Sequence, residues 1–214
     1  MTIRVAVTNQ KGGVGKTTTA VNLAASLTKA KRNVLLIDID PQGNASSAAG
    51  IKKNSENSLY EFFNSEEKIE SFIIEASGGY DIIPANNNLV AAEKIIEKTE
   101  NREKYFSAHI KKLPKKYDYI LIDFPPSLNL LTINSMVASN SVLVPLQAEF
   151  FALEGLSQLL LTVRDIRSKI NQNLKIHGIV LTMFDKRNNL SEQIEEDVRG
   201  NLGDCLLYTS DAAD

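Results

Sequence analysis

The chain has 214 residues, of which 43% are apolar and 23% are charged, and its formal net charge is −2. These values suit one globular domain with a substantial core, and they give no bulk basic character that would draw the protein onto nucleic acid. The single cysteine, Cys205, excludes an internal disulfide and a multi-thiolate cluster built from one chain. No apolar run approaches the roughly 20 residues that span a bilayer, and the N-terminus lacks the features of a secretory signal. We therefore expect a cytoplasmic protein.

Strand-like and helix-like patterns alternate along the chain. An apolar strand at 3–7 is followed by a helix with an apolar face between Ala20 and Leu27. Further β-branched runs predict strands at 33–39, 80–83, 117–122, 141–146 and 176–182. Helical patterns occupy residues 58–74, 88–98, 101–113, 128–138, 152–170 and 190–202. This alternation predicts an α/β fold with a mainly parallel, twisted sheet and helices on both faces.

The domain organisation is predicted to be simple. We expect a single domain over residues 1–204, in which the polar segment 50–57 is a surface loop. A sheet of this type is expected to continue into another strand and a covering helix. Residues 205–214 have little periodicity and do not continue the pattern. Our hypothesis is that the C-terminal strand and helix are missing and that 205–214 is an atypical, non-native tail.

The segment between the first strand and the first helix, residues 11–17, reads Lys-Gly-Gly-Val-Gly-Lys-Thr. A glycine-rich turn at this place gathers backbone N–H groups and a helix N-terminus around one point, which makes an anion site that commonly holds a triphosphate. Lys16 can reach the terminal phosphates, and the Thr17 hydroxyl can coordinate Mg²⁺. The general P-loop pattern has glycine where this chain has Gln10, and an additional lysine, Lys11, stands at the mouth of the loop.

Two later strands end in aspartates that can complete a nucleotide site. Asp38 and Asp40 follow an apolar run and lie two residues apart, so both are expected to point toward the ligand side of the sheet. Asp123 also ends an apolar run and precedes a rigid Pro-Pro turn. Any one of these aspartates, taken alone, is better read as a cap or turn residue. Together with the glycine-rich loop they predict a site for a nucleotide and its metal.

Residues 8–17, 34–47 and 119–132 together resemble the deviant Walker-A ATPases of the ParA/Soj type, which partition DNA and belong to the SIMIBI class of P-loop NTPases. The resemblance extends from Thr2 to Asp204. It implies a P-loop NTPase fold, ATP and Mg²⁺ as cofactors, slow ATP hydrolysis and an ATP-dependent homodimer. It also implies nonspecific DNA binding on the nucleoid and a ParB-type centromere-binding protein as partner.

The same resemblance implies roles for single residues. Lys11 resembles the signature lysine that crosses a dimer to touch the partner's phosphates. The residues assigned to ATP are Lys11, Gly12, Gly13, Val14, Gly15, Lys16, Thr17 and Thr18. The residues assigned to catalysis are Lys11, Lys16 and Asp40, of which Asp40 is predicted to orient the attacking water. The metal is assigned to Thr17 and Asp123. Arg187 is a candidate for contact with DNA, with a solvated loop as the alternative.

Other functions stay open at this point. A MinD-like membrane switch would need a basic amphipathic C-terminal helix, which this sequence lacks, so we expect no membrane partner. An ATP-dependent small-molecule ligase on the same fold would need a substrate pocket and would have no use for Lys11. The third alternative is a nonfunctional scaffold, because the last elements of the sheet are absent from the pattern.

Overall fold

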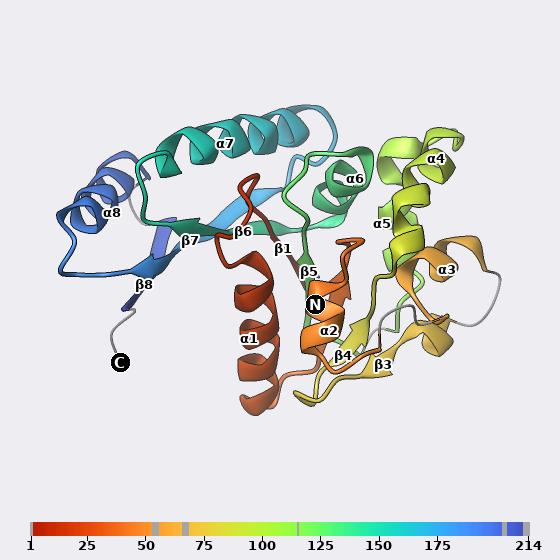
Figure 1. The fold of residues 1–214 in the computed structure, drawn as a ribbon. Helices are drawn as coiled ribbons and strands as arrows, with labels where there is room; N and C mark the ends of the chain where they lie inside the picture. Colours follow the sequence, from red (N-terminus) through yellow and green to blue (C-terminus); the bar gives the residue numbers. More distant parts are fainter. Residues whose placement is uncertain (1, 53–55, 66–68, 115, 203–204, 212–214) are drawn as a thin grey trace.

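The computed structural model describes residues 2–52, 56–65, 69–114, 116–202 and 205–211. The strands in this part of the chain are β1 (Ile3–Val7), β2 (Val34–Asp38), β3 (Ile74–Glu75), β4 (Asp81–Ile83), β5 (Tyr119–Asp123), β6 (Ser141–Gln147), β7 (Lys175–Phe184) and β8 (Leu206–Asp211). They form one sheet in the order β3-β4-β2-β5-β1-β6-β7-β8 (Figure 1). Every neighbouring pair is parallel except β3 and β4, which run antiparallel.

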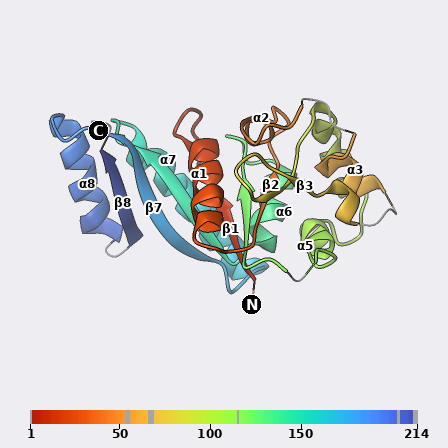
Figure 2. The same ribbon diagram turned by 90° about the horizontal axis from the view of Figure 1, so that it is seen from below.

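Helices cover both faces of this sheet. The α-helices are α1 (Lys16–Lys29), α2 (Asn44–Ala48), α3 (Leu59–Asn64), α4 (Ala92–Glu97), α5 (Tyr105–Ile110), α6 (Leu130–Ala138), α7 (Ala152–Lys169) and α8 (Asn189–Leu202). Short 3₁₀ turns are η1 (Ile69–Phe72), η2 (Asn87–Ala91) and η3 (Arg102–Lys104). Helices α1 and α2 pack on one face, and the buried side chains of α3 to α8 pack on the other. Figures 1 and 2 show α1 on the opposite side of the sheet from α7. The predicted α/β fold is confirmed.

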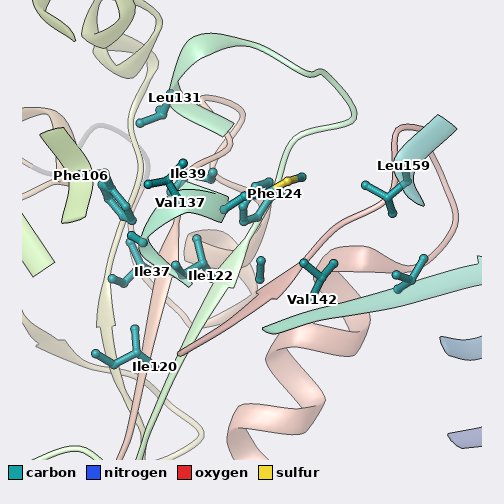
Figure 3. Close-up of a cluster of buried hydrophobic side chains, with 14 of the residues drawn as sticks. Ile37, Ile39, Phe106, Ile120, Ile122, Phe124, Leu131, Val137, Val142 and Leu159 are labelled. Atoms are coloured by element: carbon teal, nitrogen blue, oxygen red, sulfur yellow. The ribbon is translucent and has the colours of Figure 1, made fainter. Parts of the chain in front are cut away.

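The larger hydrophobic core lies between the sheet and the helices on the face opposite α1. Alternate side chains of a strand point to opposite faces of the sheet. Ile37 of β2 therefore joins this core, whereas Leu36 packs on the other face, toward α1 and α2. The residues labelled in Figure 3 are Ile37, Ile39, Phe106, Ile120, Ile122, Phe124, Leu131, Val137, Val142 and Leu159. Because both faces of the central strands are buried in this way, their carboxyl ends are held in fixed positions relative to one another.

Several short elements depart from the sequence prediction. The helix predicted over 58–74 is wrong, because α3 ends at Asn64 and a separate 3₁₀ turn leads into β3. Helix α2 and strand β3 were not predicted, since elements of five and two residues are too short to show a period. The proposed surface loop 50–57 includes residues 53–55, which lie outside the described residues.

Strand β8 is a further departure, because we expected no regular structure after residue 204. It pairs in parallel with β7 at the edge of the sheet, with an irregular register. Pairing of this kind uses backbone groups that an edge strand leaves open, so it does not require an alternating sequence. The hypothesis that 205–214 is a non-native tail stays a prediction. No helix in the described ranges combines the length and apolar character needed to cross a membrane.

Candidate nucleotide-binding site

The glycine-rich loop joins β1 to α1 at the carboxyl edge of the sheet (Figure 1). Gly13 and Gly15 adopt φ values of 77° and 81°, a left-handed conformation that costs glycine little. Gly15 is also the N-cap of α1, and no side chain caps that helix end. The first-turn N–H groups of α1 are therefore available to an anion, which the positive end of the helix dipole favours.

Hydrogen bonds from neighbouring strands hold this loop in shape. At its start, Asn9 Nδ2 donates to Pro145 O at 2.8 Å, and Asn9 Oδ1 accepts from the backbone N of Lys11 at 3.0 Å. Further along, Thr182 Oγ1 of β7 donates to Val14 O at 2.9 Å. The Val14 side chain is buried beneath the loop. The loop is thus preorganised by β6 and β7 before any ligand arrives.

Lys16 folds back over the loop from the first turn of α1. Its Nζ donates to Lys11 O at 2.7 Å, and the residue is buried. Because an ammonium group carries three N–H donors, two remain for phosphate oxygens. Burial lowers the pKa of Lys16, and the nearby carboxylates of Asp123 and Asp40 partly offset this shift. A phosphate group would supply further negative charge beside this partly desolvated cation.

Lys11 points away from Lys16, toward the turn after β6. Its Nζ lies 2.6 Å from Glu149 Oε1, and the two side chains are 40% and 32% exposed. The position of Gly12, next in the loop, has open space where a side chain would begin. The outer side of the loop is therefore accessible, and the lysine predicted to reach a second chain is paired within its own chain.

The loop faces a cleft of ≈ 540 Å³, which is in the size range of small-molecule and cofactor sites. The residues that line it are Gly12, Gly13, Gly15, Lys16, Thr17, Thr18, Asp40, Gln42, Asn44, Phe124, Pro126 and Met183. The cleft therefore brings together most of the residues predicted to bind ATP, and it places the water-positioning candidate Asp40 among them. Of the remaining two predicted loop residues, Val14 is turned into the core and Lys11 toward Glu149.

Thr17 lines the cleft and contacts Asp123, which is fully buried and is not among the residues that line the cleft. Thr17 Oγ1 donates to Asp123 Oδ2 at 2.8 Å, whereas the buried Oδ1 of Asp123 has no hydrogen-bond partner among the described residues. Burial, and then the charge of Asp38, raise the pKa of Asp123 to about 8. An unpartnered buried carboxylate oxygen is costly, and a hydrated cation would remove that cost.

These two side chains fit Mg²⁺, which prefers oxygen ligands and keeps several waters and substrate phosphates in its shell. Within the described ranges, no group of three or more His, Cys, Asp or Glu side chains is placed to hold a metal ion. The protein would therefore supply only part of the coordination shell. This is the arrangement expected for a metal that arrives with a nucleotide.

Asp38 and Asp40 have different surroundings, although both follow the apolar run of β2. Asp38 is fully buried: its Oδ2 accepts from Ser46 N and Oγ at 2.8 and 2.6 Å, and its Oδ1 accepts from Asp40 N at 3.1 Å. The prediction that Asp38 points toward the ligand is therefore wrong. Asp40 borders the cleft, and its Oδ1 accepts from Gln42 N at 2.9 Å. By accepting a hydrogen bond from Asp40 N, Asp38 fixes the backbone of the loop that carries Asp40.

Comparisons with known proteins agree with this geometry. A family profile described as an AAA domain matches residues 2–176. The chain is 48% identical over 198 residues to the chromosome partitioning protein ParA of Myxococcus xanthus, covering 92% of this chain and 70% of that protein. It is 48% identical over 208 residues to the sporulation initiation inhibitor protein Soj of Bacillus subtilis, covering 96% and 82%. The chain belongs to the ParA/Soj family of P-loop ATPases.

A solved structure shares the fold of this ParA/Soj chain under a different name. It is the cobyrinic acid a,c-diamide synthase of Mycobacterium smegmatis with a bound ATP analogue and magnesium. The two structures superpose with a TM-score of 0.88 at 36% identity, covering 94% of this chain and 83% of the synthase. The fold thus also occurs in an enzyme named for small-molecule chemistry.

Two residues of this ParA/Soj site were not predicted from the sequence. Ser46 binds Asp38, and its Oγ also accepts from Ala85 N at 2.9 Å, so it links β2 to the segment after β4. Glu149 pairs with Lys11. No local motif marks either one, because Ser46 joins Asp38 to the distant Ala85, and Glu149 pairs with Lys11 of the distant glycine-rich loop. The only available signal was the position of Glu149 just after a strand that ends at the same edge of the sheet.

The DNA candidate Arg187 lies apart from the residues that line the cleft. It follows β7, is 81% exposed at its side chain, and donates from Nε and Nη2 to Asp185 at 3.0 and 2.9 Å. Hydrogen bonds from Arg187 lower the pKa of Asp185. The guanidinium is accessible to a phosphate backbone, but its binding edge is engaged by a carboxylate of the same loop.

Proposed function

We propose that this chain is an ATP-dependent switch for partitioning chromosomes or plasmids. It binds ATP with Mg²⁺ in the cleft, forms a homodimer, associates with DNA without sequence preference and hydrolyses ATP slowly. One arrangement carries the proposal: Lys16 and Thr17 line the cleft, and Thr17 is hydrogen-bonded to the buried Asp123, whose Oδ1 has no partner among the described residues. The relatives named ParA and Soj support the partitioning role.

Phosphate binding is assigned to the loop and to Lys16. The loop N–H groups and the N-terminus of α1 receive the phosphate oxygens, and the two free N–H donors of Lys16 add charge-assisted hydrogen bonds. Thr17 and Asp123 hold the metal from the opposite side. When bound, Mg²⁺ neutralises charge on the β- and γ-phosphates. Most of the binding energy thus comes from groups that are already in place.

Hydrolysis is assigned to Asp40. Its backbone N is fixed by Asp38, and its Oδ1 is used by Gln42 N. Its Oδ2 has no protein partner among the described residues, and the residue borders the cleft. A carboxylate oxygen in this position can accept a hydrogen bond from a water and orient it toward the γ-phosphate. The low turnover rate that we propose is carried over from the ParA/Soj family resemblance.

Dimerisation is assigned to the outer side of the loop, where Lys11 and Gly12 lie. The open space at Gly12 admits the approach of a second chain, and Lys11 is the side chain that would reach the partner's phosphates. We place the protein in the cytoplasm on the nucleoid, with nonspecific DNA and a ParB-type centromere-binding protein as partners. The ParB-type partner follows from the family alone, whereas Arg187 is the candidate residue for contact with DNA.

A second candidate function is ligation of a small molecule with ATP. The likeness to the diamide synthase favours it. The higher identity to relatives named for partitioning, and a lysine placed on the outside of the loop, favour the switch. Consumption of ATP without dimerisation or DNA binding would support the ligase.

The Lys11→Ala variant tests the proposed switch against the ligase. Nucleotide titration measures its ATP affinity, and sedimentation with a non-hydrolysable ATP analogue measures its dimerisation. The variant is expected to bind ATP as the parent does, because Lys16 and the loop amides are intact, but to remain monomeric. Lys29→Ala, at the far end of α1, is the charge-matched control and should dimerise normally. Normal dimers of Lys11→Ala would show that Lys11 is an ordinary loop lysine, whereas a parent chain that consumes ATP without dimerising would favour the ligase.

A further inference from the structure

Lys11 is held within its own chain at three points. Its backbone N donates to Asn9 Oδ1 at 3.0 Å, its carbonyl accepts from Lys16 Nζ at 2.7 Å, and its ammonium lies 2.6 Å from Glu149 Oε1. The first two contacts fix the backbone and are compatible with a bound nucleotide. The third contact directs the charged end of the side chain toward the β6–α7 turn. Only this third contact has to open if Lys11 is to reach another molecule.

The carboxylate that receives Lys11 is itself placed by the fold. Glu149 N donates to Gln147 O at 2.9 Å, and Glu149 O accepts from Ala152 N at 2.9 Å, so the turn between β6 and α7 fixes the Glu149 backbone. The next residue, Phe150, is 78% exposed, which shows that this turn faces solvent. Glu149 Oε1 itself is buried and has no hydrogen-bond partner among the described residues, so its contact with Lys11 is an ion pair only. The Lys11 side chain is 40% exposed, so a second copy of the chain can reach the lysine side of the pair.

We infer that Glu149 is a positioning residue that retains Lys11 in the free chain and releases it to the nucleotide of a second copy. The inference rests on the proposed dimer. If the pair stayed intact in the dimer, the Glu149 carboxylate would lie close to the anionic phosphates of the other chain, and this like-charge repulsion favours breaking the pair. A triphosphate carries more negative charge than one carboxylate and competes for the lysine. The Lys11–Glu149 pair therefore disfavours dimerisation of nucleotide-free chains. It breaks when the second chain has bound a nucleotide.

The expected size of the effect follows from exposure and symmetry. An ion pair between partly exposed side chains contributes about 2–5-fold to an equilibrium constant. A two-fold symmetric dimer breaks two such pairs, one in each chain. Removing the carboxylate should therefore tighten the nucleotide-dependent dimer by roughly 4–25-fold. High salt should weaken the pair in the parent and so reduce this difference.

The first test is the dimer dissociation constant of Glu149→Gln, measured by sedimentation with a non-hydrolysable ATP analogue. We expect a roughly 4–25-fold lower constant than in the parent, with unchanged nucleotide affinity of the monomer. Glu154→Gln removes the same charge from an exposed residue in the first turn of α7 and is the control, for which no change is expected. A weaker dimer in Glu149→Gln would place Glu149 in contact with the partner chain and would overturn the inference.

A second readout needs no dimer. In the nucleotide-free monomer, acetylation of Lys11 by an amine-reactive reagent, quantified by mass spectrometry against exposed Lys29, should rise by about 2–5-fold in Glu149→Gln. Glu149→Asp keeps the charge with a shorter reach and should give an intermediate value. Unchanged reactivity of Lys11 in Glu149→Gln would overturn the inference. If the parent fails to dimerise with the analogue, the proposed function fails, and this labelling experiment still decides whether Glu149 holds Lys11.

Discussion

The carboxyl ends of β2 and β5 differ from the carboxyl end of β7 in how their polar side chains are held. Asp38 and Asp123 are fully buried and are bound by Ser46 and Thr17 from helices on the same edge of the sheet. After β7, by contrast, Arg187 is largely exposed and donates hydrogen bonds to Asp185, two residues away. The first region is held by hydrogen bonds between strands and helices, whereas the Arg187–Asp185 pair lies within one loop.

This difference indicates which region is suited to chemistry and which to transient contact. Removing a partner from a buried polar group costs about 1–3 kcal/mol, whereas an exposed ion pair contributes about 0–1 kcal/mol. Groups around Asp123 therefore keep their positions whether or not a ligand is present. The exposed pair after β7 can exchange its carboxylate for another anion at little cost.

The largest expected effect is on hydrolysis in Asp40→Ala. Loss of the group that orients the water should reduce the hydrolysis rate on the order of 10²–10⁴-fold. ATP binding should survive, because the loop amides and Lys16 are untouched, so the variant should accumulate as an ATP-bound dimer. Single-turnover ATPase assays measure this, with Asp165→Ala on the exposed side of α7 as control. Hydrolysis at the parent rate would show that another group positions the water, and buried Asp38 is then a poor substitute.

Lys16→Ala should abolish tight binding of ATP. The loss of two charge-assisted hydrogen bonds predicts an affinity decrease of about 10²-fold or more. Unlike Asp40→Ala, this variant should remain an empty monomer. Isothermal titration with Mg·ATP measures the change, and Lys29→Ala serves again as the charge-matched control. An affinity within a factor of about two of the parent would remove Lys16 from the phosphate site.

The buried carboxylates predict a pH dependence of stability. Burial raises the pKa of Asp38 to about 6, and burial together with the charge of Asp38 raises that of Asp123 to about 8. The folded chain therefore binds more protons than the unfolded chain between about pH 4 and pH 8, so the free energy of unfolding falls as pH rises through this window. The shift at Asp38 corresponds to about 3 kcal/mol.

Urea denaturation from pH 5 to pH 8, without nucleotide or metal, measures this decline. Asp123→Asn should flatten the upper half of the curve, and Mg·ATP should restore stability at pH 8 by supplying positive charge beside Asp123. Stability that stays constant or rises between pH 6 and pH 8 would contradict the assignment of a raised pKa.

The phosphate loop was predictable because its signal is local. A strand, a glycine-rich turn and a helix within about 25 residues suffice to define an anion site, and Lys16 and Thr17 follow from their place in it. Asp123 was predictable from its position at a strand end, since parallel strands meet at one edge of the sheet. The site thus follows from the sequence wherever the secondary structure alone brings the residues together.

The surroundings of Asp38 and Lys11 were not predictable in the same way. Asp38 turns to Ser46 because the five-residue helix α2 presents both a backbone N–H and a hydroxyl to it. Lys11 turns to Glu149 because the β6–α7 turn ends beside the loop. Neither contact leaves a period or a spacing in the sequence, since each depends on how short segments pack in three dimensions.

Ser46→Ala tests the hydrogen-bond network around Asp38, and its expected effect is smaller than those of the preceding variants. The change removes the hydroxyl bond to Asp38 and leaves Ala85 N without its acceptor, so the free energy of unfolding should fall by about 1–3 kcal/mol. Ser47→Ala, on the exposed side of the same helix, should have little effect. Equal unfolding midpoints of the two variants in urea would mean that the Asp38 network does not stabilise this edge of the sheet.

The smallest effect is expected after β7. If DNA is bound there, Arg187→Ala should weaken binding only a few-fold, equally for all sequences, and should reduce the salt slope by about one. The loss is small because Arg187 has to leave Asp185 before it can contact a phosphate. Asp185→Asn removes this competitor and should strengthen binding, in the direction opposite to Arg187→Ala. Fluorescence anisotropy with two unrelated duplexes over a range of salt concentrations separates these outcomes. A loss of affinity confined to one duplex would indicate base recognition. Unchanged DNA affinity in both variants would mean that the Arg187–Asp185 pair only stabilises the loop.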